Sequence, residues 1–318
     1  MKNTSIFFAG LIVLGLTSCG SPNQGDIVKQ KYVHKYGLEI PSDDWSSRGE
    51  DGIVISTLAS GVTVSNAYVH GTLHGETTHT FPYSDIIEKV DNYENGHLAK
   101  QTFNNENGWP REEIRYLAGN RTEKTKWYEN SAPQSVEMYE GRSLVSGEYY
   151  TSNNQLESRV DKGEGMRIVR DFYGTHKRNE QIAHGNVVLV LNYHPNQVLE
   201  SETPYTNGVI EGTRQTFYPS GEPKTSESWI AGKQHGLAVT YKNGFVWMET
   251  PFVDGHREGV EKIYRHGNEI VEEITWFEGK KHGPHRRYFD DIVKTEWYYR
   301  DSIMPKGKRD QFMTHGHE

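Results

Sequence analysis

Histidines beside glycines are the residues of this sequence that could most readily do chemistry. They recur along the chain as His70, His74, His184, His235, His256 and His282. A row of imidazoles could bind metal ions or respond to pH near neutrality. If the histidines lie one hairpin apart, however, they are separated by roughly 10 Å, which is too far for two of them to share a zinc ion. We therefore expect polar turn residues here and no metal site.

Adjacent acidic residues are the other candidates for catalysis, at Glu112/Glu113 and Glu272/Glu273. Consecutive residues of a strand point to opposite faces, so neither pair can form a carboxylate dyad. We expect one member of each pair to be solvated and the other to have a cross-strand partner. The chain also contains no G-x-S-x-G, H-E-x-x-H or phosphate-binding glycine loop. The sequence predicts no catalytic residues, no cofactor and no enzyme.

The composition argues against a nucleic-acid binder that relies on phosphate contacts, because the 318-residue chain has a formal charge of −8. Hydrophobic residues make up only 34% of the chain, which is too few for one thick globular core. Aromatic residues make up 12%, whereas disordered segments are poor in them. The composition therefore favours thin, half-buried sheets with one polar face.

The elements that carry these residues repeat about every 23 residues. A first turn slot advances 230 residues in ten steps, through Gly61, Ser84, Gly108, Ser131, Asn154, Gly174, Asn196, Gly221, Gly244, Gly267 and Asp291. All but two of these residues are Gly, Asn or Asp, which tolerate positive φ, so the slot predicts a left-handed backbone. A second turn reads Y-x-x-G or a close variant, and its clearest glycines are Gly71, Gly208, Gly232, Gly255 and Gly279.

The segments between the turns alternate with period two. In residues 245–252, for example, Val246, Met248, Thr250 and Phe252 share one face. Each repeat is therefore predicted to be a β-hairpin, and successive hairpins to continue one antiparallel meander. We expect the aromatic residue before each second turn to stack on its counterpart one repeat away.

The pattern Y-x-x-G, strand, Y-x-x-G-x-x-x-G resembles the bacterial variant of the MORN repeat. The resemblance covers about residues 52–300, is cleanest over 205–283, and is degenerate over 141–200, where VDKG (160–163) lacks its aromatic residue. It implies an all-β fold, an elongated single-layer antiparallel meander of about ten hairpins in an open, solenoid-like array. MORN-like families serve in interaction and scaffolding, and sometimes contact lipid.

The chain begins with an apolar run from Ile6 to Leu16 that leads into Leu-Thr-Ser-Cys19. The run is far shorter than the ~20 residues that span a bilayer, so it predicts a secretory signal. Its end resembles the bacterial lipobox, which implies cleavage before Cys19 and attachment of diacylglycerol and palmitate-type acyl chains to it. Glycine at position 20, directly after the cysteine, resembles the sorting signal of outer-membrane lipoproteins. The resemblance implies an exported lipoprotein anchored in the outer membrane of a Gram-negative bacterium.

Four segments follow from these patterns. Residues 1–18 are the expected signal peptide, 19–50 the lipidated cysteine with a linker and N-terminal cap, 51–300 the repeat array, and 301–318 a mobile C-terminal tail. Residues 279–318 hold nine Lys or Arg against six Asp or Glu. This basic end could contact anionic lipid, but three net charges over forty residues favour an ordinary solvated repeat.

We expect the array to act as a protein-binding or scaffold surface in the cell envelope, through aromatic side chains. The candidate residues are Tyr205, Trp229, Phe252, Phe277 and Trp297, although each of them could instead be a structural residue of the ladder. The partner is an unknown protein. Two alternatives stay open, an envelope spacer that contacts anionic lipid and an inhibitor- or antitoxin-type partner of another protein, and a hydrolase on a β scaffold ranks last.

Overall fold

The structure is a computed structural model that describes residues 27–305 and residue 308. These residues form 27 β-strands and one short helix. The chain divides into two compact units, Met1–Pro110 and Arg111–Glu318. The predicted signal peptide, Cys19 and most of the predicted tail lie outside the described residues.

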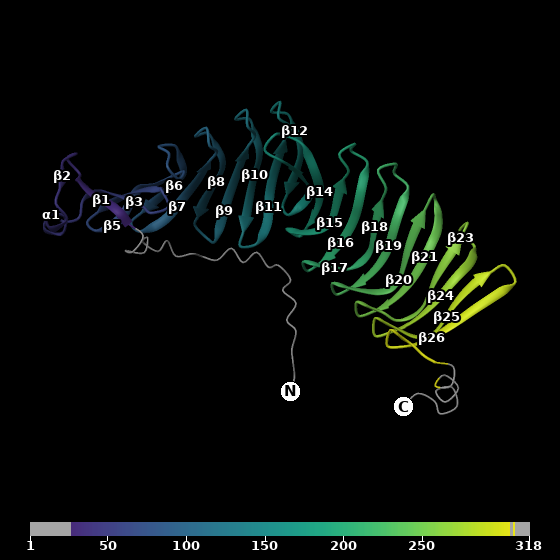
Figure 1. Ribbon diagram of the computed structural model, residues 1–318. Helices are drawn as coiled ribbons and strands as arrows, with labels where there is room; N and C mark the ends of the chain where they lie inside the picture. The colour runs from purple at the N-terminus through teal and green to yellow at the C-terminus, as the bar shows by residue number, and fades with distance from the viewer. Residues whose placement is uncertain (1–26, 306–307, 309–318) are drawn as a thin grey trace. The chain divides into compact units, whose positions relative to one another are not determined.

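The first unit is an open antiparallel sheet. Its elements are β1 (Ile27–His34), β2 (Glu39–Ile40), α1 (Ser42–Ser47), β3 (Gly52–Leu58), β4 (Thr63–Val69), β5 (Thr72–Thr80), β6 (Ile87–Glu94) and β7 (His97–Asn104). Strand β1 pairs with both β2 and β3, and from β3 to β7 each strand pairs with the next (Figure 1). Strand pairing thus begins at Ile27, inside the segment expected to form a linker and cap.

Helix α1 covers the aromatic side chains at the start of this sheet. Pro41 precedes the helix with φ −60°. Asp43 and Asp44 lie in its first turn, where their negative charges interact favourably with the positive end of the helix dipole. Trp45 of the helix is buried, with its ring 5.6 Å from the ring of Tyr32 and 6.2 Å from that of Tyr68. The helix therefore shields from water two rings that a lone first strand would leave exposed.

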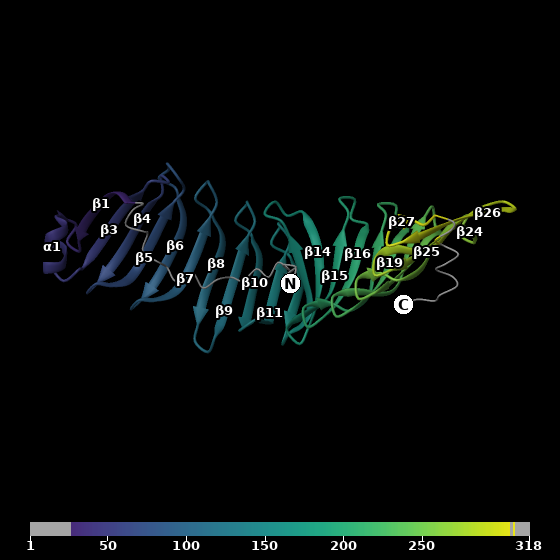
Figure 2. The same ribbon diagram turned by 60° about the horizontal axis from the view of Figure 1, so that its bottom comes forward.

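The second unit continues the same alternation of strand and turn. Its strands are β8 (Pro110–Leu117), β9 (Arg121–Trp127), β10 (Pro133–Glu140), β11 (Ser143–Tyr150), β12 (Leu156–Asp161), β13 (Glu164–Arg170), β14 (His176–Ala183), β15 (Asn186–Tyr193), β16 (Leu199–Thr206), β17 (Val209–Ile210), β18 (Gly212–Phe217), β19 (Pro223–Ile230), β20 (Lys233–Lys242), β21 (Phe245–Val253), β22 (His256–Arg257), β23 (Gly259–Arg265), β24 (Glu269–Phe277), β25 (Lys280–Phe289), β26 (Ile292–Tyr299) and β27 (Ser302–Ile303). Successive strands pair antiparallel in chain order, except that β16 pairs with both β17 and β18, and β21 with both β22 and β23 (Figure 2). The predicted all-β fold, an open antiparallel meander of hairpins, is confirmed.

Most of the second turns have positive φ at both central residues, the geometry of a two-residue type I′ hairpin turn, whereas at Gly141–Arg142 only Gly141 has positive φ. At His70 and Gly71 the φ angles are 48° and 71°, and at Asp254 and Gly255 they are 50° and 86°. The left-handed backbone predicted for the first turn is confirmed at Gly61, Gly108, Ser131, Asn154, Gly174, Gly221, Gly244 and Gly267. It is off by one residue elsewhere, because Tyr83, Gln197 and Asp290 take the positive φ in place of Ser84, Asn196 and Asp291.

A row of backbone hydrogen bonds joins the second turns to one another. The N–H of Gly255 donates to the carbonyl of Gln234 at 2.8 Å, and the N–H of Gly279 to the carbonyl of Arg257 at 3.0 Å. The same bond to the preceding turn is made by Gly71, Gly96, Gly141, Gly163, Gly185 and Gly232. We name this row the turn ladder. Each bond contributes roughly 0.5–1.5 kcal/mol, so the repeats are linked at this edge independently of their side chains.

The second unit has its hydrophobic core where the repeat pattern is degenerate. Leu144, Tyr149, Val160 and Ile182 form a buried cluster. The N–H of Leu144, in β11, also donates to the carbonyl of Gly185, beyond β14, at 3.0 Å. A direct backbone bond between elements three strands apart requires the sheet to curl sharply here, so this part of the chain encloses side chains that a flat sheet would expose.

Candidate functional site

The five predicted aromatic residues divide between the two faces of the sheet. Trp229 lies opposite Gly212, and Phe252 opposite Gly236. Tyr205 holds the corresponding position of its own repeat, opposite Ile210. We call the face that carries these rings the ladder face.

Phe277 and Trp297 are each one residue out of step with that face. The residues opposite the repeat glycines are their neighbours, since Trp276 pairs with Gly259 and Tyr298 with Gly283. Because successive side chains of a strand alternate, Phe277 and Trp297 point to the opposite face. The five candidates therefore do not form one surface.

The repeat pattern predicts that each ladder ring stacks directly on its counterpart one repeat away. Between Trp276 and Tyr298, a side chain of the intervening strand instead lies close to both rings. The guanidinium of Arg257 lies 4.6 Å from the centre of the Trp276 ring, and the Lys281 ammonium lies 5.9 Å from Trp276 and 5.5 Å from Tyr298. Consecutive rings are two strands apart, roughly 10 Å, and the residue of the intervening strand varies, since Gln234 pairs with Trp229 and Ile210 with Tyr205.

The opposite face carries a row of exposed apolar side chains at the second-turn edge. Ile230, Val253, Phe277 and Tyr299 end their strands in four successive repeats, and 51%, 44%, 45% and 47% of their surfaces are exposed. We name these four residues the outer stripe. The His282 ring packs within it, 5.5 Å from the ring of Phe277 and 5.1 Å from that of Tyr299.

Histidines beside the glycines have structural roles that the sequence analysis only partly foresaw. His70 and His184 are the first central residues of type I′ turns. His74 lies before the second glycine of its repeat, and its Nδ1 accepts a hydrogen bond from the N–H of Asn95 at 3.3 Å. No group of three His, Cys, Asp or Glu side chains that could hold a metal ion is found among residues 27–305.

Glutamates at the same repeat position as His74 accept a shorter hydrogen bond from the backbone of the next second turn, and we call this contact a cap. Glu211 accepts from the N–H of Ala231 at 2.6 Å, and Glu258 from the N–H of Glu278 at 2.8 Å. Glu211 lies between β17 and β18, and Glu258 lies between β22 and β23, so neither glutamate is part of a strand ladder. This irregular position directs each carboxylate along the edge of the sheet toward the next turn. The signal was present in the sequence, because the residue before the second glycine alternates between His and Glu in TLHG, VIEG, KQHG, HREG and KKHG.

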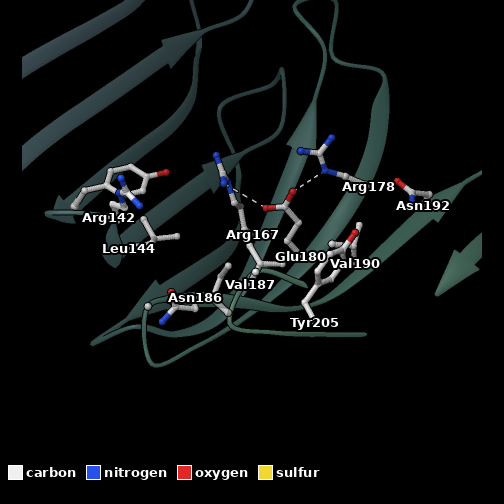
Figure 3. Close-up of a pocket in the computed structure, with 14 residues that line it drawn as sticks. Arg142, Leu144, Arg167, Arg178, Glu180, Asn186, Val187, Val190, Asn192 and Tyr205 are labelled. Atoms are coloured by element: carbon white, nitrogen blue, oxygen red, sulfur yellow. Dashed lines mark hydrogen bonds and ion pairs between the residues drawn. The ribbon is translucent and has the colours of Figure 1, made fainter. Parts of the chain in front are cut away.

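A hollow of about 620 Å³ opens on the ladder face of the second unit (Figure 3). It lies between the rings of Tyr139 and Tyr205, where two successive repeats have no aromatic residue on the ladder. Val160 and Ile182 take the place of the rings; both are buried, and Ile182 lines the hollow. Aliphatic side chains are smaller than the tyrosine of a regular repeat, so the missing ring volume accounts for the hollow.

A buried ionic network forms one wall of the hollow. The Nε of Arg167, in β13, lies 2.9 Å from Oε1 of Glu137, in β10, and its Nη1 lies 3.2 Å from Oε2 of Glu180, in β14. The hydroxyls of Tyr139 and Tyr149 donate to Glu137 at 2.9 and 3.0 Å. Burial, followed by the negative charge of Glu137, raises the pKa of both tyrosines, so they stay neutral donors. Burial opposes the charge of Arg167, but the two carboxylates outweigh it and raise its pKa.

Two further arginines reach the hollow. Arg178 binds Oε1 of Glu180 through its Nε at 2.6 Å, which leaves its two terminal nitrogens outside that pair, and Figure 3 shows Arg167 and Arg178 on either side of Glu180. Arg142 lines the other end and is exposed. The apolar part of the lining comes from Leu144, Ile182, Val187, Val190 and Tyr205. The arrangement places guanidinium donors beside an apolar floor, which suits an anion with an apolar body.

Three cations near the basic end of the array, Arg286, Arg287 and Lys294, form ion pairs with carboxylates of the sheet. Arg286 pairs with Glu273 at 3.3 Å and Arg287 with Glu272 at 3.0 Å. His285 also contacts Glu272. The expectation that only one of the two adjacent glutamates has a partner is therefore wrong, because a carboxylate on either face meets a cation of the neighbouring strand.

A search of the described residues for an apolar helix of membrane-spanning length finds none.

Comparisons with known proteins do not identify a family. No protein-family model matches the sequence, and no curated protein matches it. Among solved structures, the chain is similar to the crystal structure of TcdB2-TccC3-TEV, with 9% identity, a TM-score of 0.17, and coverage of 87% of this chain and 21% of that one. A structure of the Photorhabdus luminescens Tc holotoxin pore matches with 9% identity, a TM-score of 0.16, and coverage of 83% and 16%. This chain spans about a fifth of the length of the first of these, and likeness at such TM-scores supports no shared function.

Proposed function

We propose that this protein is a lipid-anchored cell-envelope protein whose MORN-like hairpin repeats form a protein-binding surface. The outer stripe carries the proposal. A row of apolar side chains that stays exposed over four repeats is unusual for a surface without a partner, because contact between apolar surface and water is unfavourable. Phe277 and Tyr299 are aromatic, and aromatic side chains frequently supply a large share of the binding energy in protein interfaces.

The regular spacing of the stripe suggests the form of the partner. Its members recur once per hairpin, so they lie roughly 10 Å apart in a line across the strands. A partner that presents apolar side chains at a similar interval, along an extended segment or one face of a helix, can contact several of them together. We assign the binding role to the outer stripe rather than to Trp229 and Phe252, which are half-buried in the ladder.

The alternative of direct contact with anionic lipid has less support. It relies on the cations at the basic end of the array, and three of these, Arg286, Arg287 and Lys294, are already held by carboxylates of the same sheet. The ammonium of Lys281 is close to the rings of Trp276 and Tyr298. An inhibitor-type role would also use a protein-binding surface, and the identity of the captured partner distinguishes it.

Site-specific photo-cross-linking in cells tests the proposal. A photoreactive phenylalanine analogue is placed at Phe277, and in a separate strain at Phe289, which is also exposed but lies at the opposite edge of the same repeats. We expect one protein to be cross-linked at position 277 and not at 289, and the cross-link to be lost when Ile230→Ser and Val253→Ser are added. Equal cross-linking at both positions would contradict a specific surface.

The anchor is tested separately with Cys19→Ser. We expect the wild-type chain in the detergent-soluble membrane fraction, labelled by a palmitate analogue, and the variant unlabelled and released from the membrane. An unlabelled wild-type chain would contradict the lipoprotein assignment without affecting the protein-binding surface.

A further inference from the structure

We propose that the hollow between Tyr139 and Tyr205 is a binding site for an amphipathic carboxylate, that is, a singly charged acid attached to an apolar body. This site lies on the opposite face from the outer stripe and does not depend on the proposed function. The ligand is either a free small acid or the carboxyl terminus of another chain, because both present the same group.

The net charge of the lining favours a ligand that carries one negative charge. Arg142, Arg167 and Arg178 face the hollow, while Glu180 lines it and Glu137 lies behind Arg167. Two carboxylates balance two of the three guanidinium groups, and one positive charge remains. A cation would be repelled from this site, and a doubly charged phosphate monoester would leave one charge unbalanced in a partly apolar setting. A carboxylate balances the lining.

The guanidinium groups have donors to offer. Within the described part of the chain, no carboxylate lies within ion-pair distance of Arg142. Arg178 engages Glu180 only through Nε, so both of its terminal nitrogens point outside the pair. A planar guanidinium can bind a carboxylate through two parallel hydrogen bonds, and such bonds are among the strongest that proteins make.

The remainder of the lining selects the body of the ligand. Val187 and Val190 in β15 and the ring of Tyr205 in β16 form an apolar floor beside the arginines. Ligand pockets commonly measure about 300–1,000 Å³, and this hollow of about 620 Å³ lies within that range. An acid with one or two apolar side chains would fill it, whereas acetate would leave the floor in contact with water.

Rigidity of the wall supports a site rather than an accidental gap. Arg167 is held by carboxylates on both sides, and its orientation is fixed before any ligand arrives. Its partner Glu137 is in turn held by the hydroxyls of Tyr139 and Tyr149. A preorganised site loses little conformational entropy on binding, so even a small ligand can be held.

Calorimetric titration of the purified mature chain tests the proposal with three probes. They are N-acetyl-leucyl-phenylalanine as the free acid, the same dipeptide as its carboxamide, and phenylacetate. We expect saturable binding of the acid with one site per chain, and at least tenfold weaker binding of the carboxamide, because a charged hydrogen bond is lost. Binding of phenylacetate as well would identify free small acids as sufficient ligands, and binding of the dipeptide acid alone would identify a chain terminus.

Matched variants locate the binding. We expect Arg142→Gln to weaken acid binding at least tenfold, and Val190→Tyr, which restores a ring volume to the hollow, to abolish it. Arg121→Gln is the control, because Arg121 follows the preceding second turn as Arg142 follows its own, is exposed, and does not line the hollow. Circular dichroism confirms that each variant is folded. No saturable binding of the acid, equal binding of acid and carboxamide, or an equal loss in Arg121→Gln would overturn the proposal.

Discussion

Arg167 and Glu137 form an ion pair at 2.9 Å although two whole strands, β11 and β12, separate their own strands in the sheet. In a flat sheet these strands would be roughly 14 Å apart. Two glycines allow the close packing around this pair, because a Cβ on Gly147 would lie 2.4 Å from the Tyr149 hydroxyl and one on Gly165 2.3 Å from the Arg159 carbonyl oxygen. The contact therefore depends on the curl of the sheet and on two positions without a side chain.

Without the Glu137 carboxylate, Arg167 and Arg178 share the single charge of Glu180, so one guanidinium of the buried network is no longer balanced. We expect Glu137→Gln to lower the free energy of unfolding by about 3 kcal/mol, at the low end of the usual range because Arg167 is partly exposed. The double variant Glu137→Leu with Arg167→Leu should recover part of this loss. Urea denaturation measures both. Glu148→Gln is the control, since its pair with Arg159 is 3.5 Å long and exposed, and it should cost less than about 1 kcal/mol. Equal losses in the two single variants would contradict the role of the buried pair.

Gly165 and Gly255 differ in what a side chain would meet. A Cβ on Gly165 would lie 2.3 Å from the carbonyl oxygen of Arg159, and its φ is 144°, a conformation that residues with a side chain rarely adopt. A Cβ on Gly255 would meet no atom within 4 Å, and its φ is 86°. We expect Gly255→Ala to cost about 1–2 kcal/mol from backbone strain alone. Gly165→Ala should cost clearly more, or prevent folding, in thermal denaturation. A smaller loss of stability for Gly165→Ala than for Gly255→Ala would contradict the close approach of Gly165 to the backbone of Arg159.

The glutamate caps at the second-turn edge should contribute measurably to stability. Glu258→Ala leaves the N–H of Glu278 without its carboxylate acceptor. Loss of a comparable cap at a helix end costs roughly 0.5–2 kcal/mol, and we expect a value in that range here. Glu200→Ala is the matched control, because Glu200 is an exposed strand residue, and it should change the free energy of unfolding by less than about 0.5 kcal/mol. Chemical denaturation of the two variants decides whether the cap matters.

Asp51 should make the first unit sensitive to acid. It accepts a hydrogen bond from the N–H of His70 at 2.6 Å and pairs with Lys35 at 2.9 Å, and these contacts lower its pKa. A lowered pKa means that the stabilisation is fully present above the unfolded value of about 3.9 and is lost as the pH falls through the folded pKa. Asp51→Asn should therefore be less stable than wild type at pH 6, with a difference that shrinks between pH 4 and pH 2.

Urea unfolding of the wild type and the Asp51→Asn variant across this pH range tests the linkage. Asp85→Asn is the control, since Asp85 is exposed, and its difference from wild type should stay near zero at every pH. A constant difference for Asp51→Asn between pH 6 and pH 2 would contradict the proposed ionisation.

The sequence supports the architecture well, because glycine spacing and strand alternation are local signals. Placement of the ladder ring at Phe277 failed for a local reason: Trp276 and Phe277 are both aromatic, and only the pairing of Trp276 with Gly259 decides which of them faces the ladder. The hollow left a trace in the sequence, as the missing rings at Val160 and Ile182. Its arginine wall did not, because the contact of Arg167 with Glu137 depends on a curl of the sheet that no single repeat encodes.

The turn ladder has a consequence for how such a chain can diversify. Its bonds join backbone groups, which are the same in every residue except proline, so the register of the repeats does not require any particular side chain on the ladder face. Gly185 still donates to Gly163 in the repeats where Ile182 and Val160 have replaced the rings. Point mutations can therefore change the side chains of the ladder face, in one repeat or in several neighbouring ones, while the backbone bonds keep the repeats in register.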